Sequence, residues 1–128
     1  MIDPMVRIVP TTTTLSTRDA RRLASFYEEL LGWQRTVDEP DWVVIAGEAT
    51  PHRLAFHEDV AHEAPEWPSR EGRQQQQVHL ELGTDDVAAA VAHALACGAT
   101  EANVQPQDEV RVMLDPDGHP FCLFPAEG

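Results

Sequence analysis

The chain has 128 residues, a hydrophobic fraction of 42% and no apolar run that approaches the about 18 residues of a membrane helix, so we expect one globular domain with its own core. Its formal net charge is −13 and all nine basic residues are arginines, which argues against nucleic acid and anionic membranes as partners and excludes chemistry through a lysine amine. Two cysteines and an N-terminus without a secretion signal favour a reduced, cytoplasmic protein.

The first half of the chain begins with a β-rich segment, residues 7–17, and continues into an amphipathic helix. Ser16 and Thr17 are expected to supply the N-cap hydroxyls of this helix, and Gly32 is expected to end it. Three strands are predicted next, at residues 33–37, 42–47 and 52–57, with a turn at residues 39–41.

The longest stretch without a regular pattern is residues 59–75. Loops of this length inside a small domain are often functional or mobile. Trp67 lies here between two prolines. Two interpretations are open, because this side chain suits a rigid aromatic lid over a site and equally a tryptophan that pins the loop to the surface.

A strand with a polar face is predicted at residues 77–82. Val78, Leu80 and Leu82 alternate with His79 and Glu81, and this period of two places the apolar residues on the core and the other two on the opposite face. An imidazole beside a carboxylate is a plausible acid–base pair. We therefore predict that His79 and Glu81 lie together and are candidate catalytic residues.

The remaining elements repeat the order of the first half. Alanine-rich residues 85–97 predict a helix that stops at Gly98, and residues 100–104, 109–114 and 119–124 predict strands, with a strong turn signal at residues 115–118. A constant offset of 67 residues relates Thr12 to His79 and Ala55 to Cys122. The predicted fold class is α+β, with two tandem βαβββ modules whose curved mixed sheets enclose a cleft. We expect one domain over residues 1–128, with module one at about 7–58, a linker at 59–75 and module two at about 76–125.

Strand alternation also predicts which side chains face the cleft, where a small ligand would bind. The candidate pocket residues are Thr12, Thr14, Ala55, His57, His79, Glu81, Cys122 and Phe124, with Trp67 as the possible lid.

Several motifs, in order and at matching spacings, make the chain resemble a known superfamily. They are residues 19–27 (DARRLASFY) running into 30–33 (LLGW), 79–82 (HLEL) with Asp86, 97–99 (CGA), and 115–121 (DPDGHPF). The chain resembles the glyoxalase, bleomycin-resistance and extradiol-dioxygenase superfamily, which has the vicinal oxygen chelate fold. This resemblance implies a small-molecule ligand and a homodimer.

The resemblance also implies positions for a metal site. In metal-dependent members, the first and last strands of each module supply ligands, usually histidine and glutamate, and the matching positions here are Thr12, Ala55, His79 and Cys122. Only His79 keeps the expected ligand type, so we expect no metal at these four positions and no cofactor. The alternative is a divalent ion (Zn, Fe or Mn) bound by His79 and Cys122, with Glu81 and His57 as further ligands of a non-standard cluster.

Three functional hypotheses follow, in order of preference. The first is a glyoxalase-like protein with a degraded metal site that binds a small organic molecule in its cleft. The second is a lyase, isomerase or dioxygenase-type enzyme that uses His79, with Glu81 or Cys122, and an atypical or absent metal. The third is a glyoxalase-type metalloenzyme despite the substitutions.

Overall fold

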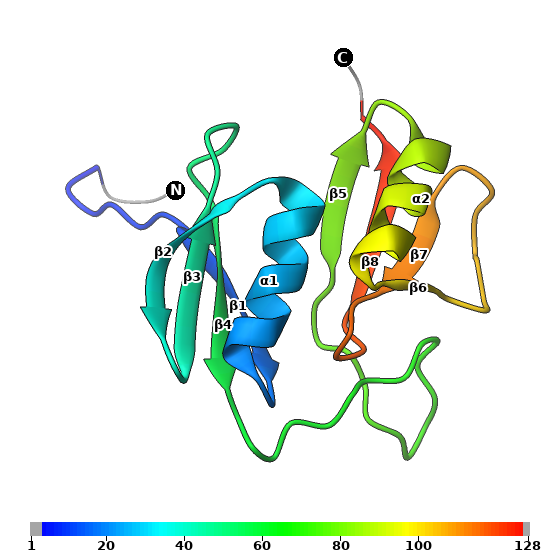
Figure 1. The fold of residues 1–128 in the computed structure, drawn as a ribbon, viewed down its shortest axis with the longest axis horizontal. Helices are drawn as coiled ribbons and strands as arrows, with labels where there is room; N and C mark the ends of the chain where they lie inside the picture. The colour runs from blue at the N-terminus through cyan, green and yellow to red at the C-terminus, as the bar shows by residue number, and fades with distance from the viewer. Residues whose placement is uncertain (1–3, 127–128) are drawn as a thin grey trace.

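The computed structural model describes residues 4–126 and consists of two copies of one unit. The first copy comprises β1 (Thr12–Thr17), α1 (Ala20–Leu31), β2 (Gln34–Glu39), β3 (Trp42–Ala46) and β4 (Arg53–Glu58). The second comprises β5 (Leu80–Thr84), α2 (Val87–Cys97), β6 (Thr100–Glu101), β7 (Arg111–Leu114) and β8 (Pro120–Pro125). Figure 1 shows the two units side by side, each with a helix against a sheet, which confirms the predicted α+β class and the tandem βαβββ modules.

Each unit forms a four-stranded mixed sheet, and the two sheets have the same topology. Their strand orders are β1-β4-β3-β2 and β5-β8-β7-β6. In both, the first and last strands of the unit are parallel neighbours while the remaining pairs are antiparallel. Thr14 pairs with Ala55, and Glu81 pairs with Cys122. The backbone register therefore repeats with the offset of 67 residues that the sequence predicts.

The first helix begins later than predicted. Its N-cap is Asp19, whose side chain accepts a hydrogen bond from the backbone N–H of Arg22. The prediction that Ser16 and Thr17 cap this helix is wrong, because β1 stays paired with β4 as far as Thr17 opposite Glu58. Pairing with a neighbouring strand thus outweighs the local capping preference of these two residues.

Both helices end at the predicted glycines. Gly32 and Gly98 have φ values of 70° and 116°, a left-handed conformation that glycine adopts without a steric penalty. The second helix is capped at its other end by Asp86, which accepts from the N–H of Ala89. None of the helices within residues 4–126 is long and apolar enough to cross a membrane.

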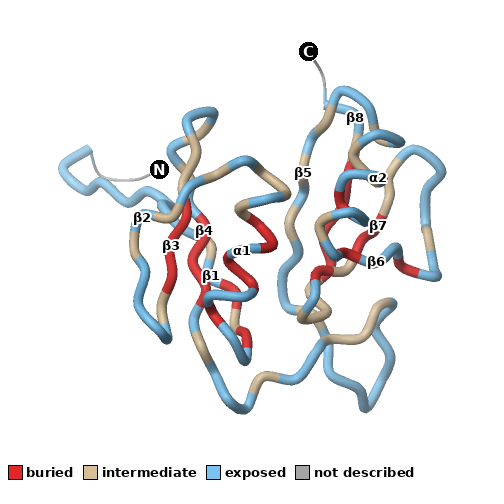
Figure 2. Tube along the Cα trace, in the orientation of Figure 1, coloured by how far each residue is buried: buried red, intermediate tan, exposed pale blue. Residues whose placement is uncertain are grey.

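The two units share one hydrophobic core. α1 packs against β3 and β4, α2 packs against β8, and the two helices contact each other. Tyr27 of α1 stacks on Phe56 with ring centroids 5.6 Å apart and meets Phe121 of the second unit edge-on at 6.2 Å. Figure 2 shows buried stretches on α1, β3, β4 and β8 and a largely exposed segment between the units. This shared core fixes the orientation of the two sheets.

The segment between the units is irregular, as predicted, and it extends up to β5. Val78, which the alternation pattern places on the core, is 64% exposed, so that prediction is wrong. The reason is that β5 begins only at Leu80, and the residues before it belong to the connecting segment. The alternation beyond that point holds, since Leu80 and Leu82 pack against the shared core.

Candidate functional site

His79 and Glu81 lie on the same side of the chain at the start of β5. His79 Nε2 is 2.7 Å from Glu81 Oε1, and His79 Nδ1 is 3.2 Å from Gln76 Oε1. Both ring nitrogens of His79 are therefore engaged, one by the adjoining segment and one by the strand. The side chains of His79 and Glu81 are 34% and 55% exposed, so a ligand can reach them from solvent.

Cys122 joins this pair from the neighbouring strand. It lies opposite Glu81 in the β5–β8 register and is buried, with 7% of its surface exposed. Burial, and then the adjacent Glu81 carboxylate, raise the pKa of the Cys122 thiol to about 11, so the thiol stays protonated at neutral pH. The ligand atoms of His79, Glu81 and Cys122 all lie within 4.8 Å of one another. Within residues 4–126 this is the one group of three such side chains close enough to share an ion.

The three side chains line a cavity of about 380 Å³ in the second unit. Its other walls are mostly apolar and comprise Trp67, Pro106, Gln107, Val110, Val112 and Phe124. The Trp67 indole N–H donates to the carbonyl of Val104 over 3.0 Å. Trp67 therefore pins the connecting segment to the second unit, as one of the two interpretations has it, and its side chain also lines the cavity.

The first unit contributes differently from what was expected. Ala55 is fully buried, His57 is exposed next to Trp42 with ring centroids 6.3 Å apart, and Thr12 is exposed. Thr14 lines a separate cavity of about 340 Å³. The predicted pocket residues from the second unit and the segment before it are thus brought together, namely His79, Glu81, Cys122, Phe124 and Trp67. Those of the first unit, Thr12, Thr14, Ala55 and His57, do not line this cavity.

The four positions that correspond to the metal ligands of related metalloenzymes do not fit a metal. The Ala55 methyl offers no lone pair, and the Thr12 hydroxyl is 3.2 Å from the hydroxyl of Thr11. The first unit therefore supplies no histidine or carboxylate at these positions. Any ion in this part of the protein would need a donor set other than Thr12, Ala55, His79 and Cys122.

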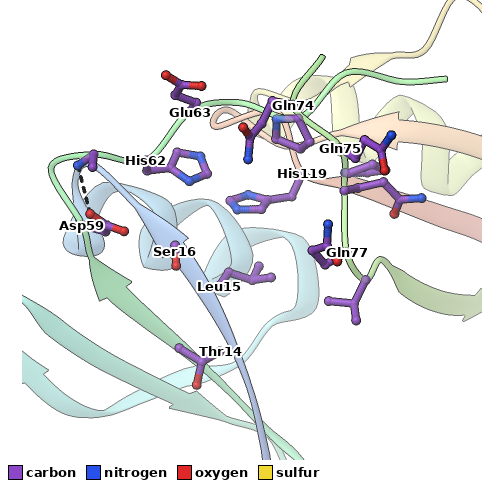
Figure 3. Close-up of a pocket in the computed structure, with 15 residues that line it drawn as sticks. Thr14, Leu15, Ser16, Asp59, His62, Glu63, Gln74, Gln75, Gln77 and His119 are labelled. Carbon is purple, nitrogen blue, oxygen red and sulfur yellow. Dashed lines mark hydrogen bonds between the residues drawn. The ribbon is translucent and has the colours of Figure 1, made fainter. Parts of the chain in front are cut away.

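The cavity beside Thr14 contains two histidines that are not among the predicted pocket residues. His62 from the connecting segment and His119, which immediately precedes β8, stack with ring centroids 5.0 Å apart (Figure 3). Gln74, Gln75 and Gln77 line the same cavity. His62 and His119 are 57 residues apart, and a stacking contact at that separation leaves no local signal in the sequence.

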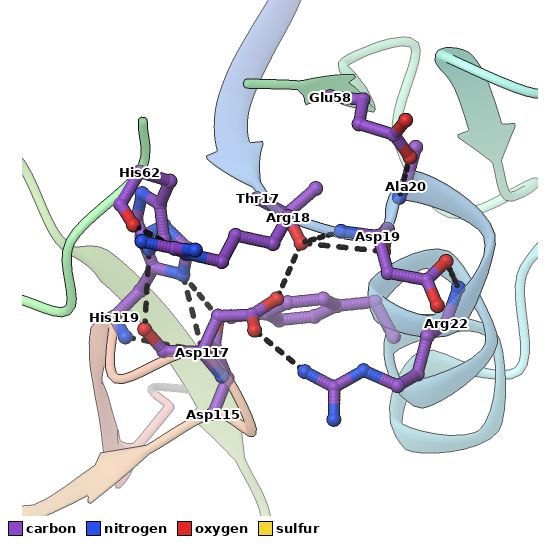
Figure 4. Close-up of polar contacts among 11 residues, drawn as sticks. Thr17, Arg18, Asp19, Ala20, Arg22, Glu58, His62, Asp115, Asp117 and His119 are labelled. Atoms are coloured by element: carbon purple, nitrogen blue, oxygen red, sulfur yellow. Dashed lines mark hydrogen bonds and ion pairs between the residues drawn. The ribbon is translucent and has the colours of Figure 1, made fainter. Parts of the chain in front are cut away.

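A buried polar network surrounds the turn at residues 115–118. The Asp115 carboxylate accepts the Tyr27 hydroxyl at 2.7 Å and lies 2.9 Å from His119 Nδ1 (Figure 4). Burial alone would lower the pKa of His119, but the hydrogen bond to Asp115 and the charges of Asp115 and Asp117 outweigh it and raise this pKa. The sequence predicts the turn, but it does not predict that Asp115 and Asp117 bind side chains of α1 in the other unit.

Comparison with known proteins agrees with this geometry. A family model described as "Glyoxalase-like domain" matches residues 12–124. Among curated proteins, no sequence is significantly similar to this chain.

Solved structures share the fold at low sequence identity. A glyoxalase/bleomycin resistance protein/dioxygenase family enzyme from Burkholderia phytofirmans is 19% identical, with 88% of this chain and 94% of that chain covered and a TM-score of 0.66. A bleomycin resistance determinant encoded on transposon Tn5 is 20% identical, with coverage of 94% and 100% and a TM-score of 0.63. The trypanothione-dependent glyoxalase I of Leishmania major is 19% identical, with coverage of 93% and 87% and a TM-score of 0.64.

The family match spans nearly the whole chain, and it coincides with the duplicated βαβββ units and their repeated register. The chain belongs to the glyoxalase-like domain family of the vicinal oxygen chelate superfamily.

Proposed function

We propose that this protein binds a small organic cation with a flat apolar part in the cavity of its second unit. The observation that carries this proposal is the Glu81 carboxylate, which lines a cavity walled by Trp67 and Phe124. A carboxylate suits a cationic group, and an aromatic face favours both a flat ring and a positive charge.

The charge distribution supports a cationic rather than an anionic ligand. The described residues that line the cavity include no arginine, so a ligand anion would find no guanidinium there, and His79 is already paired with Glu81. The chain as a whole carries a formal charge of −13, which attracts cations and repels anions at a distance. The comparison structures described as a bleomycin resistance determinant and as glyoxalases further support a small-molecule ligand.

Matched probes test this proposal. Benzamidine, benzamide and benzoate share one ring and differ in charge, so calorimetric titration of the metal-free protein compares a cation, a neutral amide and an anion directly. We expect benzamidine to bind tightest and Glu81→Gln to weaken it by about tenfold, which corresponds to about 1.4 kcal/mol. Glu109→Gln, an exposed carboxylate outside this cavity, is the control. Equal affinities for the three probes, or no effect of Glu81→Gln, would contradict the proposal.

An enzyme is the second candidate, because the 2.7 Å contact between His79 and Glu81 is the geometry of an acid–base pair. A lyase, isomerase or dioxygenase-type reaction would then take place in the same cavity. Turnover that disappears in His79→Ala while ligand affinity is unchanged would establish this alternative.

The proposal also covers the assembly state of the protein and its location in the cell. We expect a homodimer in the cytoplasm, in which a second copy covers the exposed His57 and Thr12 of the first unit. Sedimentation velocity on the purified protein measures the assembly state directly.

A further inference from the structure

We propose that His79, Glu81 and Cys122 form a zinc site contained entirely in the second unit. The site differs from the four positions of related metalloenzymes because Glu81 replaces both ligands of the first unit. It uses the same Glu81 carboxylate as the proposed ligand site, so zinc and an organic cation would compete for it, but zinc binding does not depend on the ligand.

Proximity is the first support. The ligand atoms of the three side chains lie within 4.8 Å of one another, and the His79 and Glu81 atoms, now hydrogen-bonded at 2.7 Å, would separate slightly around an ion. Ligand atoms around a tetrahedral zinc ion are about 3.3–3.8 Å from one another, so side-chain shifts of about 1 Å would bring the set to bonding distance. Two of these residues, Glu81 and Cys122, are fixed by the pairing of β5 with β8.

The kinds of atom are the second support. One imidazole nitrogen, one thiolate sulfur and one carboxylate oxygen form a donor set that suits zinc, whereas Mg²⁺ and Mn²⁺ prefer sites built of oxygen. The thiolate and the carboxylate would together balance the two charges of the ion. The adjoining cavity of about 380 Å³ leaves room for a water molecule as the fourth ligand.

Gln76 is the third support, since it orients the imidazole. Its Oε1 lies 3.2 Å from His79 Nδ1, so an Nδ1–H donor points at Gln76 and directs Nε2 toward Glu81 and Cys122. Histidines that bind metals usually donate their second N–H to such a partner. When zinc binds, the proton of the Cys122 thiol is released to solvent.

The chain contains a natural control for this site. Cys97 Sγ lies 3.7 Å from His93 Nε2 on α2, but that nitrogen also lies 3.2 Å and 3.1 Å from the carbonyl oxygens of Glu29 and Leu30. This second pair offers a thiol and an imidazole without a third ligand, within the part of the chain that the structure describes. Binding at the proposed site should therefore survive Cys97→Ser and His93→Ala.

The test uses the full-length protein and the metal alone. Metal-free protein is titrated with Co²⁺, a spectroscopic substitute for zinc, followed by displacement with Zn²⁺ and elemental analysis after dialysis. We expect one ion per chain, a thiolate-to-cobalt charge-transfer band, and no comparable signal with Mg²⁺. Cys122→Ser should abolish the charge-transfer band, and His79→Ala and Glu81→Gln should weaken Zn²⁺ binding at least about tenfold.

Absence of the band, its persistence in Cys122→Ser, or its loss in Cys97→Ser would overturn the zinc site. Circular dichroism of each variant establishes that it is folded. Benzamidine binding by metal-free protein is a separate measurement, so the zinc site and the organic-cation site can fail independently.

Discussion

Thr17, the last residue of β1, donates a hydrogen bond of 2.5 Å to the carboxylate of Asp117, which lies 100 residues later in the turn before β8. The other oxygen of Asp117 accepts from the Arg22 guanidinium of α1 at 2.6 Å (Figure 4). One nearly buried carboxylate thus links a strand and a helix of the first unit to the second. With the aromatic contacts of Tyr27, it holds the two sheets in one orientation.

Removal of this link should destabilise the protein. Asp117→Ala removes the nearer acceptor of the buried Thr17 hydroxyl, which keeps only the Asp19 carbonyl at 3.2 Å, and it also removes the partner of the Arg22 guanidinium. We therefore expect the free energy of unfolding to fall by about 2–3 kcal/mol, as for the loss of hydrogen bonds to a charged group. Urea unfolding followed by tryptophan fluorescence measures this change. Asp108→Asn, an exposed residue of the β6–β7 loop, is the control and should change the value by less than about 0.5 kcal/mol. A similar effect of both variants would argue against the link.

Stability should depend on pH through His119. Its pKa is raised in the folded protein, so its contribution is fully present below the unfolded pKa of 6.5 and is lost as the pH rises through the folded value. His119→Asn should therefore reduce the free energy of unfolding more at pH 6 than at pH 9. Urea unfolding of both proteins across this range gives the difference. A constant difference, or an NMR titration of His119 below 6.5, would contradict the assignment.

The Cys122 thiol should react slowly in metal-free protein. With its pKa at about 11, only about 0.1% of the thiol is ionised at pH 8, and the side chain is buried. Iodoacetamide should therefore modify Cys97 first, although burial and then Glu29 also raise the pKa of that more exposed thiol. Peptide mass spectrometry over time separates the two sites. Faster labelling of Cys122 would show that its thiol is not buried beside Glu81 as described.

Trp67 should matter for ligand binding in two separable ways. Trp67→Phe removes the indole hydrogen bond to Val104 but keeps an aromatic wall, so we expect a loss of about 1 kcal/mol in stability and nearly unchanged benzamidine affinity. Trp67→Leu also removes the aromatic face and should weaken benzamidine binding several-fold. Calorimetry and urea unfolding measure both quantities. Equal affinities of the two variants would exclude Trp67 as a wall of the binding site.

Much of the fold could be predicted because the repeat is visible in the chain. The offset of 67 residues that relates Thr12 to His79 also relates the residue pairing of β1 with β4 to that of β5 with β8, because the two units have the same topology. The first helix start could not be predicted, because Thr17 is a good local cap and only pairing with β4 keeps it in a strand. The position of Val78 could not be predicted either, because the apolar–polar alternation includes this residue although the strand begins only at Leu80.

The candidate site could be predicted only within one unit. His79 immediately precedes β5 and Glu81 is its second residue, so the alternation of side chains along an extended chain predicts their proximity. Cys122 is predicted on the cleft face from strand alternation and from its match to Ala55, and the structure adds that it pairs with Glu81. The placement of Thr14 in a different cavity depends on the connecting segment, whose path no local pattern specifies. The same holds for the stack of His62 on His119.

The repeated register also gives the protein an internal reference. Asp19 and Asp86 cap equivalent helices, and Thr14 and Ala55 occupy the backbone positions of Glu81 and Cys122. Exchange of equivalent side chains between the units would separate what a residue type contributes from what its surroundings contribute. The effect of each sequence difference between the two units can thereby be measured within one molecule, under the same solution conditions for both units.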